Sequence, residues 1–293
     1  MRFLGLGVAS IVSSALYVTA VEPFILRRIK RNQLTLPNWP NGLKLRVALL
    51  SDIHACEPWM SAKRLSRIVA STNELGADIV LLLGDYLSSM DLVTGSVSAE
   101  QWSAELGRLK APLGVHAILG NHDWWADKAA QERQDGPTLA GQALEAAGIK
   151  LYENDATRLE KDGSGFWIAG LGDQLAFPPY QSLGRSFWRG RDDLDATLSK
   201  VISDEPILLM AHEPDIFPQV SDRVSLTLSG HTHGGQIRLF GWSPVVPSGF
   251  KNRYAYGHVV ENGRHLLVSG GLGFSILPVR LGMPPEINLV EIG

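Results

Sequence analysis

The sequence predicts an α/β fold in which a largely parallel sheet is covered by helices on both faces. Apolar runs of strand length recur along the chain, and several are separated by stretches with apolar residues three and four positions apart, as in amphipathic helices. Strands that are apolar throughout are typical of sheets buried on both faces. With 293 residues, 45% of them hydrophobic, the chain can form one large or two small domains.

The expected strands and helices alternate from residue 45 onward. Strands are expected at residues 45–51, 78–84, 114–120, 166–172, 206–212 and 225–230, and most of these runs end in glycine or a polar residue. Helices are expected at residues 61–75, 99–109 and 137–148. Because continuous apolar strands alternate with helices, parallel pairing is favoured.

The N-terminal segment differs in composition from the rest. Residues 3–21 are apolar or small and carry no charge, and as a helix they would measure about 28 Å, close to the thickness of a bilayer core. Four basic residues follow at positions 27, 28, 30 and 31. This asymmetry predicts an anchor in the inner (cell) membrane, with the catalytic body on the cytoplasmic side.

A cleaved secretory signal, followed by export, is the alternative for this segment. Val18, Thr19 and Ala20 form a passable small-residue cleavage site. The anchor is favoured because the apolar run is long for a signal and basic residues follow it closely. The expected organisation is an anchor with its basic flank at 1–31, a Pro- and Asn-rich linker at 32–44, and one domain at 45–293.

Composition excludes several classes of protein. The formal net charge is −3, with no long run of like charges, so stable nucleic-acid binding is not expected. The single cysteine, Cys56, excludes an internal disulfide and a Cys-rich zinc site.

Polar residues able to bind metal ions follow five of the expected strands. They are Asp52 and His54, then Asp85, then Asn121, His122 and Asp123, then His212, and finally His231 and His233. In open α/β sheets, ligands bind in loops beyond the carboxyl ends of the strands. These side chains are therefore expected to meet at one edge of the sheet.

The chemistry of this set suits divalent metals. Neutral imidazoles with carboxylate and amide oxygens bind Mn, Fe, Co, Ni or Zn, and of these manganese is favoured. Seven ligands are too many for one ion, but they suit two ions at about 3.5–4 Å that share a bridging carboxylate. His231 and His233, two positions apart on an extended segment, point the same way and can each serve one ion.

The ordered strings DxH, GD, GNHD, H and GHxH resemble the calcineurin-like metallophosphoesterase superfamily, along which residues 45–293 can be laid. The longer strings AHEPD, GHTHGGQI and GGLGFSILPVRLGMPPEI are similar to its bacterial branch of membrane-associated or exported phosphodiesterases. The resemblance implies a four-layer α/β/β/α sandwich and a metal-dependent phosphoric ester hydrolase.

The resemblance also implies a role for each residue. Asp52, His54 and His233 would hold the first metal, Asp85 would bridge, and Asn121, His212 and His231 would complete the second site. Water activated by the cations would attack phosphorus in line, and His122 would stabilise or protonate the leaving oxygen. Many members carry a further aspartate that orients this histidine, whereas Ser88 stands at that position here. Asp123 and Asp91 are the candidate replacements.

Two further groups of residues have open interpretations. Arg185, Arg189 and Arg191, with Phe187 and Trp188, form either a phosphate-binding rim or a solvated helix start. Seven large apolar residues lie in or near the expected loops, and exposure of several would indicate a lipid-facing cleft, whereas others belong to the core: Trp59, Met60, Trp124, Trp125, Phe177, Phe240 and Trp242.

The predicted function is hydrolysis of a phosphodiester or pyrophosphate bond at a membrane. The expected partners are a phosphate ester substrate and the membrane itself, and a lipid-linked substrate such as UDP-2,3-diacylglucosamine is the specific hypothesis. One alternative is a phosphodiesterase for soluble cyclic or dinucleotides. Another, from a different class, is a metal-binding scaffold without turnover, which the retention of His122 beside a full ligand set disfavours.

Overall fold

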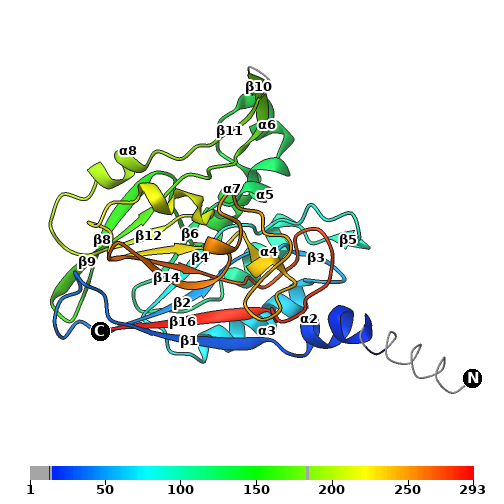
Figure 1. Ribbon diagram of the computed structural model, residues 1–293, viewed down its shortest axis with the longest axis horizontal. Coiled ribbons are helices and arrows are strands. Elements are labelled where there is room, and N and C mark those ends of the chain that lie inside the picture. The colour runs from blue at the N-terminus through cyan, green and yellow to red at the C-terminus, as the bar shows by residue number, and fades with distance from the viewer. Residues whose placement is uncertain (1–12, 14, 183–184) are drawn as a thin grey trace, which may run out of the picture.

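The computed structural model describes residues 13, 15–182 and 185–293, and within them two six-stranded sheets form the centre of the molecule (Figure 1). The first sheet has the order β1 (Arg28–Leu34), β16 (Glu286–Ile292), β2 (Leu45–Leu50), β4 (Ile79–Leu83), β6 (Val115–Ile118), β7 (Lys150–Leu151). The second has the order β14 (Gly257–Glu261), β15 (Arg264–Val268), β13 (Leu226–Ser229), β12 (Ile207–Met210), β9 (Ser164–Gly170), β8 (Asp155–Lys161).

Both sheets are mixed. The strands that the apolar runs predict pair in parallel, β2 with β4 and β4 with β6 in one sheet, β9 with β12 and β12 with β13 in the other. The antiparallel pairs are β16 with β2, β8 with β9, and β14 with β15. Parallel pairing between the apolar strands is confirmed, and the antiparallel pairs bring in strands that were not expected.

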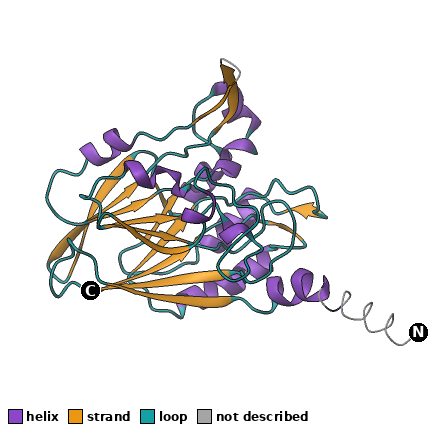
Figure 2. Cartoon of the chain, viewed as in Figure 1, coloured by secondary structure: helices purple, strands orange, loops and turns teal. Residues whose placement is uncertain are grey.

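The layers follow from which face each apolar side chain occupies. Alternate residues of β2, such as Val47 and Leu49, pack with β9 and β12 in a core between the two sheets. The residues between them, such as Ala48 and Leu50, pack with α3 (Ala62–Asn73), α4 (Ala99–Leu106) and α7 (Leu139–Ala146). The outer face of the second sheet packs with α8 (Leu194–Ser199) and η2 (Pro214–Gln219). The order is therefore helix, sheet, sheet, helix (Figure 2), and the predicted α/β class is confirmed.

The three expected helices form close to the predicted positions because each has an N-terminal cap. Ser61 and Thr138 accept hydrogen bonds from the backbone N–H groups of Arg64 and Gly141, and Ser98 forms a capping box with Gln101. Remaining short elements are β3 (Cys56–Glu57), β5 (Gly95–Ser96), α5 (Asn121–Trp125), α6 (Lys128–Arg133), β10 (Phe177–Ser182), β11 (Arg185–Arg189), η3 (His233–Gly235) and η4 (Lys251–Tyr254).

The expected basic flank and linker instead contribute to the body. β1 pairs in parallel with β16 over its full length, so that Arg28 lies opposite Glu286 and Leu34 opposite Ile292. Downstream of β1, Leu36 and Leu43 are buried in the core between the sheets. The domain boundary expected at residue 45 therefore moves back to the start of β1, because burial of these leucines favours docking over a free linker.

The expected membrane span at residues 3–21 lies mostly outside the described residues, which omit 1–12 and 14. In the part that is described, η1 (Tyr17–Val21) runs into α2 (Glu22–Phe24), and no helix is long and apolar enough to cross a membrane. Arg280 N donates to Val18 O at 3.0 Å, and Met283 N donates to the buried Glu22 carboxylate at 2.7 Å. The described start of the chain is thus fastened to the loop that precedes β16.

Candidate metal centre

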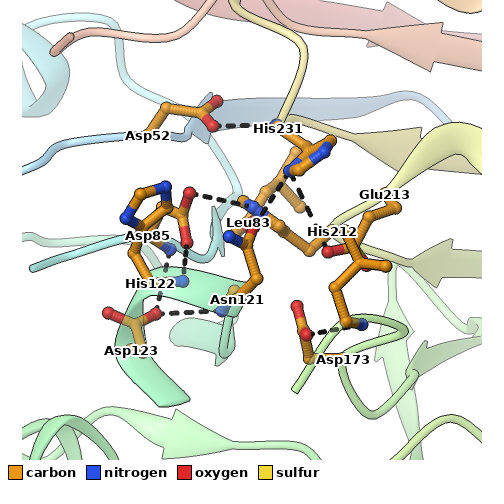
Figure 3. A network of polar contacts seen from close by, with 12 residues as sticks. Asp52, Leu83, Asp85, Asn121, His122, Asp123, Asp173, His212, Glu213 and His231 are labelled. Carbon is orange, nitrogen blue, oxygen red and sulfur yellow. Dashed lines mark hydrogen bonds and ion pairs between the residues drawn. The ribbon is translucent and has the colours of Figure 1, made fainter. Parts of the chain in front are cut away.

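Loops after β2, β4, β6, β12 and β13 bring the predicted ligands into one buried cluster. Three overlapping groups have possible ligand atoms within 4.8 Å of one another: Asp52, His54 and His233; His54, Asp85 and His122; Asp85, His212 and His231. Asn121 joins them, with its Oδ1 at 2.9 Å from His231 Nδ1. Figure 3 shows Asp85 between His122 and His212, with Asn121 and His231 beside them. Asp85 belongs to two of the groups and therefore lies centrally.

The backbone at these positions is strained in a way that turns the side chains inward. Positive φ angles occur at Asp52 (53°), His54 (47°), Asp85 (59°), His231 (66°) and His233 (51°). Residues with a side chain seldom adopt this left-handed region, and such strain is concentrated at functional sites. Gly84 precedes Asp85 with φ 92°, and a Cβ there would lie 2.8 Å from His212 Nδ1. Glycine is therefore required where β4 meets the cluster.

Backbone carbonyls set the tautomers of two histidines. His54 Nδ1 lies 3.0 Å from Leu87 O, and His212 Nδ1 lies 2.6 Å from Leu83 O. Because a carbonyl oxygen can only accept, each Nδ1 carries the proton and donates it. When neutral, each ring directs the lone pair of its Nε2 into the cluster, in the form that binds a metal.

These lone pairs face other electron-rich atoms. His54 Nε2 lies 3.1 Å from His233 Nε2 and 3.5 Å from Asp85 Oδ2, while His212 Nε2 lies 3.2 Å from the same carboxylate oxygen. Asp52 Oδ1 lies 3.7 Å from His233 Nε2. Such groups repel unless a proton or a cation lies between them, so the arrangement is suited to positive charge at two points on either side of Asp85 Oδ2.

Burial determines the charge of most of the imidazoles. It lowers the pKa of His54 to about 3 and holds the pKa values of His231 and His233 below the ordinary value, so these rings are neutral near pH 7. His212 is the exception: burial lowers its pKa, but the carboxylates of Asp85, Glu213 and Asp52 together outweigh burial and raise the pKa well above the ordinary value. Before a cation can bind there, it must displace the proton that His212 and Asp85 share.

Several buried polar atoms of the cluster have no hydrogen-bond partner within the chain. Asp52 Oδ2 and Asn121 Nδ2 are among them. Buried polar atoms without partners are uncommon and point to an ion or another bound group. Carboxylate, amide and imidazole donors on two sides of a shared carboxylate fit two divalent first-row ions.

Ser89 contacts His122, and the sequence did not identify it. Ser89 Oγ lies 2.6 Å from His122 Nδ1, and the His122 backbone N–H donates to Asp85 Oδ1 at 2.9 Å. Neither carboxylate considered from the sequence makes this contact among the described residues. The Asp123 carboxylate instead accepts the backbone N–H groups of Gly120, Asp85, Tyr86 and Leu87, and Asp91 is exposed. Asp123 therefore shapes the loop that carries Asp85.

We expect Ser89→Ala to lower turnover by about two- to tenfold, which corresponds to the loss of one hydrogen bond that holds the His122 ring. Steady-state hydrolysis of a substrate with a poor leaving group measures this effect. Ser88→Ala is the matched control, because Ser88 Oγ accepts from Met90 N. If Ser88→Ala has the larger effect, the assignment of Ser89 is wrong.

Two further charged residues approach the cluster from regions to which the sequence assigned no role. Arg280 is fully buried and its Nη2 lies 3.3 Å from His233 Nδ1, while it also donates to three backbone carbonyls. Glu213 Oε1 lies 3.9 Å from His231 Nδ1. Glu213 occurs in the string AHEPD and Arg280 in GGLGFSILPVRLGMPPEI, so a charged residue inside each motif string was the available signal.

The other candidate residues have mixed outcomes. Met60, Trp124, Phe177 and Cys56 are buried and belong to the core, whereas Phe240 and Trp242 are exposed. The segment expected as a phosphate rim or helix start forms instead β11, which pairs antiparallel with β10 in a hairpin. Arg191 pairs with Glu153 and Asp135 at 2.6 and 2.9 Å. Because Arg191 is already paired with two carboxylates, a phosphate-binding rim is disfavoured.

A family model described as calcineurin-like phosphoesterase matches residues 45–235, a range that contains all eight predicted site residues. The chain belongs to this family. It is accordingly a metal-dependent phosphoric ester hydrolase, and the family binds two metal ions. The resemblance that the motif strings indicated is confirmed.

Similar curated proteins extend over more of the chain than the family model. A protein of Bacillus subtilis named uncharacterized metallophosphoesterase YkuE is 28% identical over 94% of this chain and 88% of its own length. The Escherichia coli protein named phosphodiesterase YaeI is 29% identical, covering 99% of this chain and 98% of its own. A zebrafish transmembrane protein with metallophosphoesterase domain is 29% identical over 88% of this chain and 54% of its own length. The chain thus spans about half of this last relative.

Proposed function

We propose that the chain is a dinuclear metallophosphoesterase that hydrolyses phosphodiester or pyrophosphate bonds, with a lipid-linked substrate such as UDP-2,3-diacylglucosamine. The observation that carries the dinuclear proposal is the position of Asp85 Oδ2, which faces His54 Nε2 and His212 Nε2 at 3.5 and 3.2 Å. Two metal ions that share a ligand require a carboxylate oxygen placed between their other ligands, and Asp85 Oδ2 has this position between two histidines.

The ligands divide into two sets around Asp85. Asp52, His54 and His233 would hold one cation, Asn121, His212 and His231 the other, and Asp85 would contact both. When bound, the cations supply positive charge that offsets the negative charge on the phosphoryl oxygens. Manganese is the proposed metal, since the donor set has no thiolate and combines nitrogen with hard oxygen.

His122 is the proposed proton donor to the leaving oxygen. Its Nδ1 is held by Ser89 Oγ, its backbone N–H by Asp85, and its ring edge packs against His54 with centroids 4.8 Å apart. With the backbone fixed by Asp85 and the ring held by Ser89 and His54, one nitrogen stays at a fixed place, which general acid catalysis requires. The side chain borders the cluster without completing either ligand set, so it remains free to carry a proton.

Membrane attachment belongs to the same proposal. Retention of the N-terminal segment is supported by contacts on both sides of the alternative cleavage site after Ala20, and the cytoplasmic placement of the body is proposed from the basic residues that follow the segment. Val18 O and the Glu22 carboxylate both bind the loop at residues 280–283. One relative's name includes the word transmembrane, which is consistent with attachment. N-terminal sequencing of the mature protein tests this, and a first residue at Val21 would establish export instead.

A hydrolysis screen tests the substrate. The full chain, solubilised in detergent and loaded with Mn²⁺, is offered a lipid-linked nucleotide pyrophosphate, a cyclic dinucleotide, a nitrophenyl diester and a nitrophenyl monoester. We expect the lipid-linked pyrophosphate and the diester to be cleaved. Preference for the cyclic dinucleotide would support the soluble-substrate alternative, and no turnover with two bound metals would support a scaffold.

A further inference from the structure

Large apolar side chains are exposed together on the two loops at residues 236–250 and 275–279. They are Ile237, Leu239, Phe240, Trp242, Val245, Phe250, Ile276 and Leu277. Single exposed apolar residues are ordinary, but a contiguous group marks a surface that meets a protein, a ligand or a membrane. We refer to these eight residues as the apolar face.

Contacts between the loops make them one surface. Gln236 Nε2 donates to Leu277 O at 2.8 Å and to Val279 O at 3.0 Å, and its Oε1 accepts from Ser275 N at 2.7 Å. Arg238 N donates to Leu281 O at 2.7 Å. A hollow of about 280 Å³ lies between the loops, with Ile237, Val245, Ile276 and Leu277 in its wall. His233 of the metal centre also lines this hollow.

The tip of the first loop is a tight turn with an unusual occupant. Leu239 and Trp242 exchange two backbone hydrogen bonds of 2.9 and 3.0 Å around Phe240 and Gly241, which have φ angles of 52° and 81°. Two positive φ angles favour Asn and Gly at such a turn, and a bulky residue is strained there. Phe240 is 106% exposed, so its ring gains nothing from the fold. A strained and fully exposed phenylalanine indicates a use outside the folded chain.

The N-terminal segment leaves the body beside this face. Val18 O and the Glu22 carboxylate bind Arg280 N and Met283 N, in the loop that continues from Leu277. Leu16, Ile25 and Leu26 are exposed there. In Figure 1 the N-terminal helical turn and the orange loops lie toward the same end of the molecule. The sequence that precedes this point, residues 1–12, is apolar or small apart from Arg2.

The charges around the apolar face are one-sided. Segments 16–31, 236–253 and 270–285 contain a single acidic residue, Glu22, and its carboxylate is buried. Of the basic residues in the same segments, Arg27, Lys30, Arg238 and Lys251 form no ion pair among the described residues, whereas Arg28, Arg31 and Arg253 pair with glutamates outside the segments and Arg280 is buried. Basic residues around exposed aromatic and aliphatic side chains complement an anionic lipid surface.

We propose that the apolar face docks on the surface of a lipid bilayer, with Phe240 and Trp242 inserted among the lipid headgroups. Trp and Phe are well suited to this interface, and no exposed carboxylate of the three segments opposes it. The hollow lined by His233 then opens toward the lipid. This docking goes beyond the proposed function, since it depends on the loops and not on residues 1–12.

The experiment places an environment-sensitive dye at the tip of the loop in the full-length protein. The single native cysteine, Cys56, is buried, so Phe240→Cys introduces the accessible thiol. Ile202→Cys is the matched control, because Ile202 is 87% exposed and follows α8, which packs on the outer face of the second sheet. Both labelled proteins are mixed with vesicles of phosphatidylethanolamine containing a minor fraction of phosphatidylglycerol, with and without nitroxide-labelled lipid.

We expect a blue shift and nitroxide quenching at position 240 and no change at position 202. Three results would overturn the proposal: no response at 240 although the protein floats with the vesicles, equal responses at both positions, or no flotation. If a second protein, added without vesicles, produces the same blue shift at position 240, the proposal is overturned as well. Hydrolysis of a nitrophenyl diester by both labelled proteins checks the fold and the metal centre independently, so failure of docking is distinguishable from failure of the proposed activity.

Discussion

Asp85→Asn is expected to deplete both metal sites and to lower hydrolysis by more than about a hundredfold. The substitution keeps the shape of the side chain but removes the negative charge whose Oδ2 faces His54 and His212. Loss of a ligand from one set, as in His231→Ala, should weaken mainly one ion. Metal content per chain, measured by mass spectrometry after dialysis, distinguishes these outcomes.

Asp127→Asn provides a matched control for Asp85→Asn. Asp127 is also buried, but its two carboxylate oxygens accept from Ala130 N and Leu139 N at the start of α6 and near α7. We expect this variant to lose about 1 kcal/mol of stability and to keep both metals. Two ions retained by Asp85→Asn at the affinity of the unmodified protein would refute a shared ligand.

His122→Ala is expected to keep both metals and to lose roughly two to four decades of turnover on substrates with poor leaving groups. A nitrophenyl diester should be affected much less, because its leaving group needs little protonation. The comparison of kcat on the two substrates, together with metal content, is the measurement.

The same measurements distinguish a proton donor from a metal ligand. His122 shares a group of possible ligand atoms with His54 and Asp85, so a ligand role makes a different prediction. If His122→Ala loses one metal and slows both substrates equally, His122 is a ligand. Ser89→Ala should reproduce the substrate dependence of His122→Ala at smaller amplitude, because it acts through the same ring.

The sequence predicted the parts of the centre that depend on local order along the chain. Asp52, Asp85, His212 and His231 all follow apolar strands, and strands of that composition pair in parallel with their carboxyl ends at one edge. Positions that follow paired strands of one sheet therefore meet whatever the loops between them do. Asp52 and Asp85 follow strands of the first sheet and His212 and His231 strands of the second, so the two pairs meet only because the sheets pack against each other. The helices were predictable for a similar reason, since their apolar spacing and caps lie within short windows.

The remaining features depend on contacts between distant segments. Ser89 reaches His122 because Asp123 holds the intervening loop by its backbone, and Arg280 reaches His233 across 47 positions of sequence. β1 was not predicted, because exposed and partly buried residues alternate along it and it contains no continuous apolar run. The basic residues that follow the apolar N-terminal segment led to the prediction of a membrane-flanking segment there, and not of an edge strand.

The pairing of β1 with β16 also bears on how the protein is made. About 250 residues separate these neighbouring strands in the chain. At translation rates of about 5–20 residues per second, β1 waits on the order of ten to fifty seconds for its partner to leave the ribosome. Throughout that time the unpaired edges of β1 and β2 can pair with the wrong strands. Chaperones are expected to bind a nascent chain of this kind. Losing the last eight residues would release the first strand of the sheet as well as the last.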